Sequence, residues 1–129
     1  MLGRMQHEPL RIGALLEHAA RFHREARIIT QRRDGRTVTH SYPEIAVRTA
    51  RLAHALTARG VAQGERLATL AWNDHRHLEL YYGVSGIGAV CHTVNPRLFS
   101  GQIAYILADA GDTHLFLDPM FLPVLAGIG

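Results

Sequence analysis

The sequence contains no lysine, and all 14 of its basic residues are arginine. This absence excludes from the chain every reaction step that depends on a lysine side chain. The arginines are spread from Arg4 to Arg97 and do not gather in one basic arm. Because no nucleic-acid-binding motif accompanies them, we interpret the net charge of +3 as a solvated surface and expect no nucleic-acid partner.

Cysteine and long apolar runs are also scarce. The one cysteine, Cys91, excludes an intrachain disulfide framework, so a reducing compartment fits the sequence best. No apolar run approaches the ~20 residues of a membrane-spanning helix, and residues 1–10 lack the long apolar stretch of a signal peptide. We therefore expect a cytoplasmic protein without a transmembrane segment.

Residues 64–118 contain the pattern that predicts the fold class. Three short apolar segments, residues 66–71, 89–94 and 113–118, alternate with two segments of helix length. Parallel strands need such long crossover connections, and the crossovers are right-handed. The sequence thus predicts an α/β fold with a parallel βαβαβ sheet, whose three strands are buried on both faces.

The residues before this pattern predict an amino-terminal helix and a β-hairpin. Apolar residues recur at helical spacing over residues 10–25. Residues 27–31 and 36–40 have the composition of two antiparallel strands, and Asp34-Gly35 between them is typical of a tight turn. We expect this hairpin to lie outside the parallel sheet or at its edge.

A second helix is predicted to begin with a capping box. Ser41 can accept an early helical N–H, Glu44 can reach back to the cap, and Gly60 supplies the stop. The expected buried stripe consists of Ile45, Thr49, Leu52, Ala53 and Leu56. We interpret this region as framework.

Two loops follow predicted parallel strands at their carboxyl ends, where open α/β sheets bind ligands. The first is Trp72-Asn73-Asp74, in which Asn73 or Asp74 can equally cap the next helix, and we favour capping. The second spans residues 93–98, where Arg97 could bind a carboxylate or hold the loop in place. We favour the structural role there as well.

The helix predicted over residues 75–85 carries His75, His77 and Glu79, which raises the question of a metal site. Residues two apart on a helix point in different directions, so the two histidines cannot bind one metal from one face. His75 and Glu79 could, but two ligands without a third are weak evidence. We therefore expect surface or first-turn histidines and no metal. The stripe expected to pack on the sheet is Leu78, Tyr81, Tyr82 and Ser85.

Glycines 83, 86 and 88 have a spacing that can indicate a dinucleotide-binding turn. That turn requires a strand before the glycines and a helix after them, so that helical N–H groups meet the pyrophosphate. Here the order is reversed. We interpret these glycines as a helix end that permits close packing, and we disfavour a dinucleotide-binding dehydrogenase.

The last predicted crossover helix begins with Ser100 as its cap and ends at Gly111. Its expected buried stripe is Ile103, Ile106, Leu107 and Ala110. Residues 119–125 are strongly apolar, and an apolar stretch with nothing to cover it is unusual at the end of a domain. We interpret the chain as a truncated domain in which a further helix begins.

Nearly the whole chain from Ile28 onward resembles the amino-terminal part of adenylate-forming acyl-CoA synthetases, the fatty-acid–CoA ligases of the AMP-binding superfamily. The resemblance rests on RLATLAWNDHRHLELYYGVSGIGAVCHTVNPRLFSGQIAYIL, followed by THLFLD. It is most similar to the medium- and long-chain branch. It implies that residues 1–129 are the first part of the ligase large domain, with the rest of that domain and the carboxy-terminal domain missing.

The resemblance implies a parent enzyme that uses ATP and Mg²⁺ to convert a fatty acid into an acyl-adenylate and then transfers the acyl group to coenzyme A. The family's phosphate-loop lysine and carboxy-terminal lysine have no counterpart in this lysine-free chain. We therefore assign no catalytic, cofactor-binding or metal-binding residue to it and expect an inactive scaffold, with a homodimer possible by family resemblance. The alternative is a non-enzymatic remnant or interaction module that retains the fold.

Overall fold

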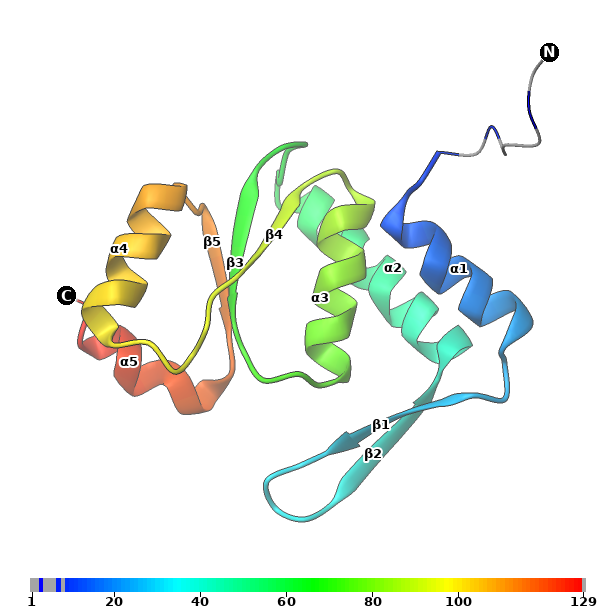
Figure 1. Ribbon diagram of the computed structural model, residues 1–129, viewed down its shortest axis with the longest axis horizontal. Helices are drawn as coiled ribbons and strands as arrows, with labels where there is room; N and C mark the ends of the chain where they lie inside the picture. Colours follow the sequence, from blue (N-terminus) through cyan, green and yellow to red (C-terminus); the bar gives the residue numbers. More distant parts are fainter. Residues whose placement is uncertain (1–2, 4–6, 8, 129) are drawn as a thin grey trace.

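The computed structural model describes residue 3, residue 7 and residues 9–128 of the chain (Figure 1). In chain order, its elements are α1 (Ile12–Phe22), β1 (Arg27–Gln31), β2 (Thr37–Ser41), α2 (Tyr42–Ala58), β3 (Arg66–Leu70), α3 (His75–Gly86), β4 (Val90–Thr93), α4 (Ser100–Ala110), β5 (His114–Leu117), the 3-10 helix η1 (Pro119–Phe121) and α5 (Leu122–Ala126). Among the described residues, no helix combines the length and the apolarity needed to cross a lipid bilayer.

The parallel sheet has the strand order β4-β3-β5 and confirms the predicted βαβαβ unit. Leu67 in the central strand lies opposite Cys91 of β4 and His114 of β5. The first crossover runs from β3 to β4, and the second returns in the opposite direction from β4, past β3, to β5. Since both crossovers are expected to be right-handed, they place α3 and α4 on opposite faces of the sheet.

Figure 1 shows this layering: α4 and α5 cover one face of the sheet, and α3 covers the other, with α2 and α1 beyond it. Each face has its own hydrophobic cluster. The residues of the α3 side are Leu56, Val61, Leu67, Leu80, Val84 and Ala89. Those of the α4 side are Ala68, Leu70, Val94, Ile103 and Phe121.

The three strands differ in burial, which corrects the prediction that all of them are buried on both faces. Only β3 is: Leu67, Ala68 and Leu70 each expose 0% of their surface. The outer strands are half-buried, and Val90 of β4 exposes 47%. β3 is the central strand, so the elements packed on the two faces of the sheet cover it most completely, whereas β4 and β5 lie at the margins of that cover.

The hairpin of β1 and β2 forms a separate two-stranded antiparallel sheet, as predicted. Gly35 adopts a φ of 81°, and the carboxylate of Asp34 accepts hydrogen bonds from the backbone and guanidinium of Arg36. The second strand is displaced by one residue from the predicted range. Ser41 is both its last residue and the N-cap of α2, so strand and helix share a boundary.

Helix starts were predicted with mixed success. The capping box at Ser41 and Glu44 is present, and the Ser41 N–H donates to the Glu44 carboxylate at 2.7 Å. At α4 the prediction was wrong, because Ser100 is the first helical residue and Phe99 is the N-cap. There the Gln102 side chain accepts a hydrogen bond from the Phe99 N–H. This bond takes the place of the predicted cap by the Ser100 hydroxyl. Helix α1 is shorter than the predicted residues 10–25.

The buried face of α3 is not the predicted stripe, since Tyr81 exposes 40% of its surface. Its buried residues are His77, Glu79, Leu80, Gly83 and Val84. Helix α3 lies between the sheet and α2, so two of its faces are covered, whereas the prediction allowed for one. Gly83 is where α2 approaches, because a Cβ there would lie 3.1 Å from a methyl group of Leu52.

The apolar residues after β5 form η1 and α5, in agreement with the predicted start of a helix. Phe121 is buried in the cluster on the α4 side, while Leu122 exposes 56% of its surface. The segment therefore covers part of its own apolar surface against the sheet and leaves part of it open.

Candidate functional site

The loops that follow β3 and β4 face each other across a cleft at the carboxyl end of the sheet. Their strands are adjacent and parallel, but α3 and α4 leave on opposite faces, so the two loops diverge. This is the topological switch point, the place where open α/β sheets bind ligands. We call it the switch-point cleft.

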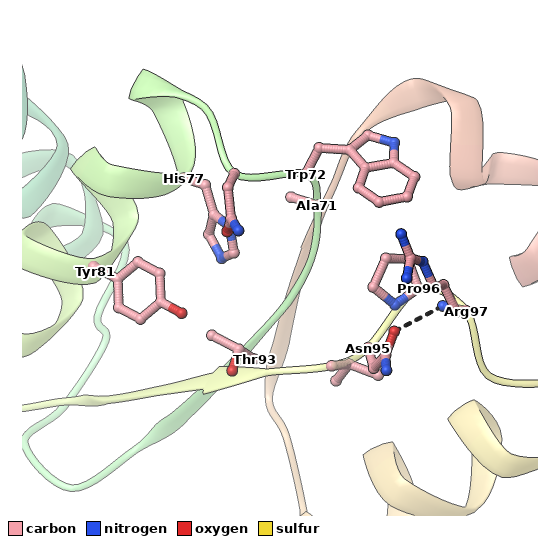
Figure 2. A pocket seen from close by; sticks show the side chains of 10 residues that line it. Ala71, Trp72, His77, Tyr81, Thr93, Asn95, Pro96 and Arg97 are labelled. Atoms are coloured by element: carbon pink, nitrogen blue, oxygen red, sulfur yellow. Dashed lines mark hydrogen bonds between the residues drawn. The ribbon is translucent and has the colours of Figure 1, made fainter. Parts of the chain in front are cut away.

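The switch-point cleft has a volume of about 360 Å³. Its lining residues are Ala71, Trp72, Asn73, His77, Tyr81, Thr93, Val94, Asn95, Pro96 and Arg97. Figure 2 shows Trp72 across the cleft from Asn95, Pro96 and Arg97, with His77 and Tyr81 from α3 closing one side. The structure thus brings the two loops that the sequence singled out into one site.

The first loop is held by residues from outside it. The Trp72 N–H donates to Asp118 Oδ2 at 2.9 Å, and the indole Nε1–H lies 2.9 Å from Met120 Sδ. Arg76 bridges Asp74, at 2.7 Å, and Asp118, at 3.1 Å. These contacts tie the loop after β3 to the end of β5. Sequence reasoning missed this role of Asp118, because its partners lie more than 40 residues away in the chain.

Asp74, and not Asn73, caps α3: its Oδ1 accepts the His77 N–H at 2.9 Å. Burial alone would raise the pKa of Asp74, but the His77 N–H and the Arg76 guanidinium outweigh it and hold that pKa below its ordinary value. Asp74 is therefore ionised at neutral pH. Its charge also suits the positive end of the helix dipole.

The second loop is fixed by its own asparagine. Asn95 Oδ1 accepts the backbone N–H of Arg97 at 3.0 Å, which the dashed line in Figure 2 marks. The guanidinium of Arg97 makes no hydrogen bond or ion pair with the described residues. The backbone of Arg97 therefore holds the loop, and its side chain is available to the cleft.

The three residues considered as metal ligands have separate partners. His75 Nδ1 lies 3.0 Å from Thr30 Oγ1 of the hairpin, and His77 Nε2 lies 2.9 Å from Thr69 Oγ1 of β3. Glu79 accepts hydrogen bonds from Arg48 of α2. Both histidines lie in the first turn, which is one of the two predicted alternatives, and His77 is buried.

Burial lowers the pKa of both His75 and His77, although the nearby carboxylate of Asp74 opposes the shift. Both are therefore neutral at pH 7. A neutral imidazole can form the observed bonds to threonine hydroxyls, in which one ring nitrogen accepts the O–H. Their role in this structure is to join α3 to the hairpin and to the central strand.

The described residues contain no group of three histidine, cysteine, aspartate or glutamate side chains arranged to hold a metal ion. The one cysteine, Cys91, is half-buried on β4, and burial raises the pKa of its thiol. Among the residues that the structure describes, the switch-point cleft presents the guanidinium of Arg97, without an ion-pair partner, next to neutral polar and aromatic side chains.

Comparison with known proteins connects this fold to one family. The family model described as "AMP-binding enzyme" matches residues 16–126. The 3-methylmercaptopropionyl-CoA ligase of Ruegeria pomeroyi is 51% identical over 99% of this chain, and the medium-chain-fatty-acid–CoA ligase of Ectopseudomonas oleovorans is 46% identical over 99%. The chain spans 24% and 23% of the length of these two relatives.

Solved structures agree with the sequence comparison. The N-terminal domain of FACL13 from Mycobacterium tuberculosis superimposes with a TM-score of 0.80 at 29% identity, over 93% of this chain and 30% of that one. A fatty acyl CoA synthetase from the same organism gives a TM-score of 0.78 over 92% of this chain and 23% of that one, at 28% identity. With a family model that covers most of its length and relatives that match it almost throughout, this chain belongs to the AMP-binding enzyme family.

Proposed function

We propose that this chain is the first part of the large domain of an acid–thiol ligase, which activates a carboxylic acid with ATP and transfers the acyl group to coenzyme A. The observation that carries the proposal is the match to two acyl-CoA ligases, at 51% and 46% identity over 99% of the chain. The chain spans about a quarter of those relatives, so the proposal concerns the complete protein to which residues 1–129 would belong.

In this proposal the chain supplies framework and the wall of a cleft, while the catalytic groups lie in other parts of the protein. The absence of lysine supports this division, because the chain cannot supply a lysine to a phosphate or an acyl-adenylate. ATP, Mg²⁺ and coenzyme A would be bound mainly elsewhere. We also propose a cytoplasmic location. We further propose a homodimer, which sedimentation of the complete protein would test.

Two classes of acid are candidates for the substrate. A medium- or long-chain fatty acid follows from the resemblance to fatty-acid–CoA ligases, such as the relative from Ectopseudomonas oleovorans. A short thioether acid is favoured by the higher identity of the Ruegeria pomeroyi relative, which is named as a 3-methylmercaptopropionyl-CoA ligase. An assay should therefore include octanoate and 3-methylmercaptopropionate side by side.

A chimera tests the proposal directly. The matching segment of the Ectopseudomonas oleovorans ligase is replaced by residues 1–129, and acyl-CoA formation is measured with ATP, Mg²⁺ and coenzyme A. We expect the chimera to retain acid-dependent activity and the 129-residue chain alone to have none. A folded chimera without activity would instead favour a non-enzymatic remnant or interaction module.

A further inference from the structure

A second, larger cavity lies between the hairpin and the carboxyl ends of β3 and β5. It has a volume of about 730 Å³, within the range of about 300–1,000 Å³ typical of small-molecule sites. One wall comes from β1, β2 and the hairpin turn, and the other from the loops after β3 and β5. In Figure 1 the hairpin lies on the side of the molecule where these strands end. We call this cavity the hairpin cleft.

The hairpin cleft has an apolar surface that reaches the solvent. Val38 of β2 lines one side, and Trp72 and Met120 line the other. Trp72 and Met120 each expose 37% of their surface. An indole, a thioether and a branched side chain facing one cavity favour a ligand with an apolar body.

The charge of the hairpin cleft is positive and only partly compensated. Four arginines line it against two aspartates. Arg48 is paired with Glu79, Arg76 joins Asp74 and Asp118, and Arg32 lies 3.4 Å from Asp34. The fourth arginine, Arg33, has no hydrogen bond or ion pair with any residue that the structure describes.

A second polar group on the same hairpin is also available. The ring of His40 lines the cleft and packs against His75 in a tilted arrangement, with centroids 4.7 Å apart, but its nitrogens have no hydrogen-bond partner among the described residues. An unpaired guanidinium, available imidazole nitrogens and an apolar wall are complementary to a molecule with an anionic head and an apolar body.

We propose that the hairpin cleft binds a small amphipathic anion, with its carboxylate or phosphate group at Arg33 and His40 and its apolar body against Trp72, Val38 and Met120. The switch-point cleft shares Trp72 and Asn73 with this site, but the other lining residues of the two clefts differ, and Arg97 belongs to the switch-point cleft alone. It does not depend on ligase activity, because every residue that it requires lies in this chain.

Trp72 allows a direct test, since it is the one tryptophan of the sequence. The 129-residue chain is titrated with decanoate, decyl phosphate, decanol or inorganic phosphate, below the concentrations at which the probes form micelles, while indole fluorescence is recorded. We expect saturable binding of decanoate, decyl phosphate or both, and binding at least about tenfold weaker for decanol and inorganic phosphate, which lack the head or the body. Equal binding of decanol, or no saturable signal with either anion, would overturn the proposal.

Variants locate the ligand. Arg33→Ala should weaken binding about tenfold, and Arg33→Lys should restore most of it, because one charge-assisted hydrogen bond is worth about that factor. Arg51→Ala removes an exposed arginine of α2 outside the cleft and should leave binding unchanged.

Arg97→Ala is the decisive comparison, since Trp72 lines both clefts. A loss of binding in Arg97→Ala but not in Arg33→Ala would place the ligand in the switch-point cleft and refute the proposal. Far-UV circular dichroism confirms that each variant is folded.

Discussion

At the scale of single residues, the ion pair of Arg48 and Glu79 joins helices α2 and α3. Arg48 Nε lies 2.6 Å from Glu79 Oε1, and the side chains expose 41% and 10% of their surfaces. Removal of the arginine leaves a nearly buried carboxylate without its partner. For a fully buried pair, such a loss costs about 3–5 kcal/mol. Since water screens the exposed part of Arg48, we expect Arg48→Ala to lower the free energy of unfolding by about 2 kcal/mol.

Urea denaturation measures this loss, with Arg51→Ala as the matched control because Arg51 is exposed on the same helix. The control should change the free energy of unfolding by less than about 0.5 kcal/mol. The double variant Arg48→Met/Glu79→Leu should be more stable than Arg48→Met alone, because it removes the stranded carboxylate as well. If Arg48→Ala and Arg48→Met were both as stable as Arg51→Ala, the pair would contribute nothing to stability.

The two neutral histidines of α3 give the chain a dependence on pH. The pKa of both His75 and His77 is lowered in the folded state, so the unfolded chain binds more protons at acidic pH. Their contribution to stability is therefore fully present above the unfolded pKa of about 6.5 and is lost as the pH falls below it. We expect the free energy of unfolding to decrease between pH 7.5 and 5.5, and His77→Asn to decrease less over the same range. An unchanged slope in this variant would contradict the assignment.

At the scale of elements, the start of α3 shows what the sequence could and could not predict. Asn73 and Asp74 are both good N-cap residues, and the sequence does not choose between them. The choice depends on where the backbone turns into the helix. That position is fixed by Asp118, which accepts the Trp72 N–H and pairs with Arg76 although it lies more than 40 residues further along the chain. The burial of α3 on two faces was missed for a similar reason, because helical periodicity does not reveal that α2 will pack on the second face.

The cap gives a prediction with a matched control in the neighbouring residue. Asp74→Ala should lower the free energy of unfolding by about 1–2 kcal/mol, because the His77 N–H loses its acceptor and Arg76 loses one of its two carboxylates. Asn73→Ala should change it by less than about 0.5 kcal/mol, since the Asn73 side chain makes no hydrogen bond with the described residues. Thermal unfolding followed by circular dichroism compares the two variants. A larger effect of Asn73→Ala than of Asp74→Ala would show that Asn73, and not Asp74, is the cap.

At the scale of the whole molecule, the alternation of short apolar and helical segments was sufficient to predict the parallel βαβαβ unit and the separate hairpin. It did not predict the strand order β4-β3-β5, because an alternating pattern is compatible with several orders. That order brings the loops after β3 and β4 together across a switch point. The sequence identified both loops, including Arg97, but the cleft between them follows from the topology, and the hairpin cleft was not anticipated at all.

The same topology leaves both outer edges of the sheet without a strand partner among the described residues. Unpaired edges favour pairing with another copy of the chain, and β4 presents Val90, which exposes 47% of its surface, on such an edge. We therefore expect the isolated 129-residue chain to associate as its concentration rises. Val90→Lys should reduce this association, because a charge on an edge strand opposes strand pairing.

Val47→Lys is the matched control, since Val47 exposes 53% of its surface on α2 and adds the same charge away from the sheet. Sedimentation velocity over a range of concentrations should show a lower average mass for Val90→Lys than for the original chain and for Val47→Lys. Some association should persist in Val90→Lys, because the outer edge of β5 remains open. If both lysine variants reduce association equally, net charge is the cause and the edge of β4 is not the contact. If the original chain is monomeric throughout, the open edges are protected by the short length of the strands, four residues each in β4 and β5.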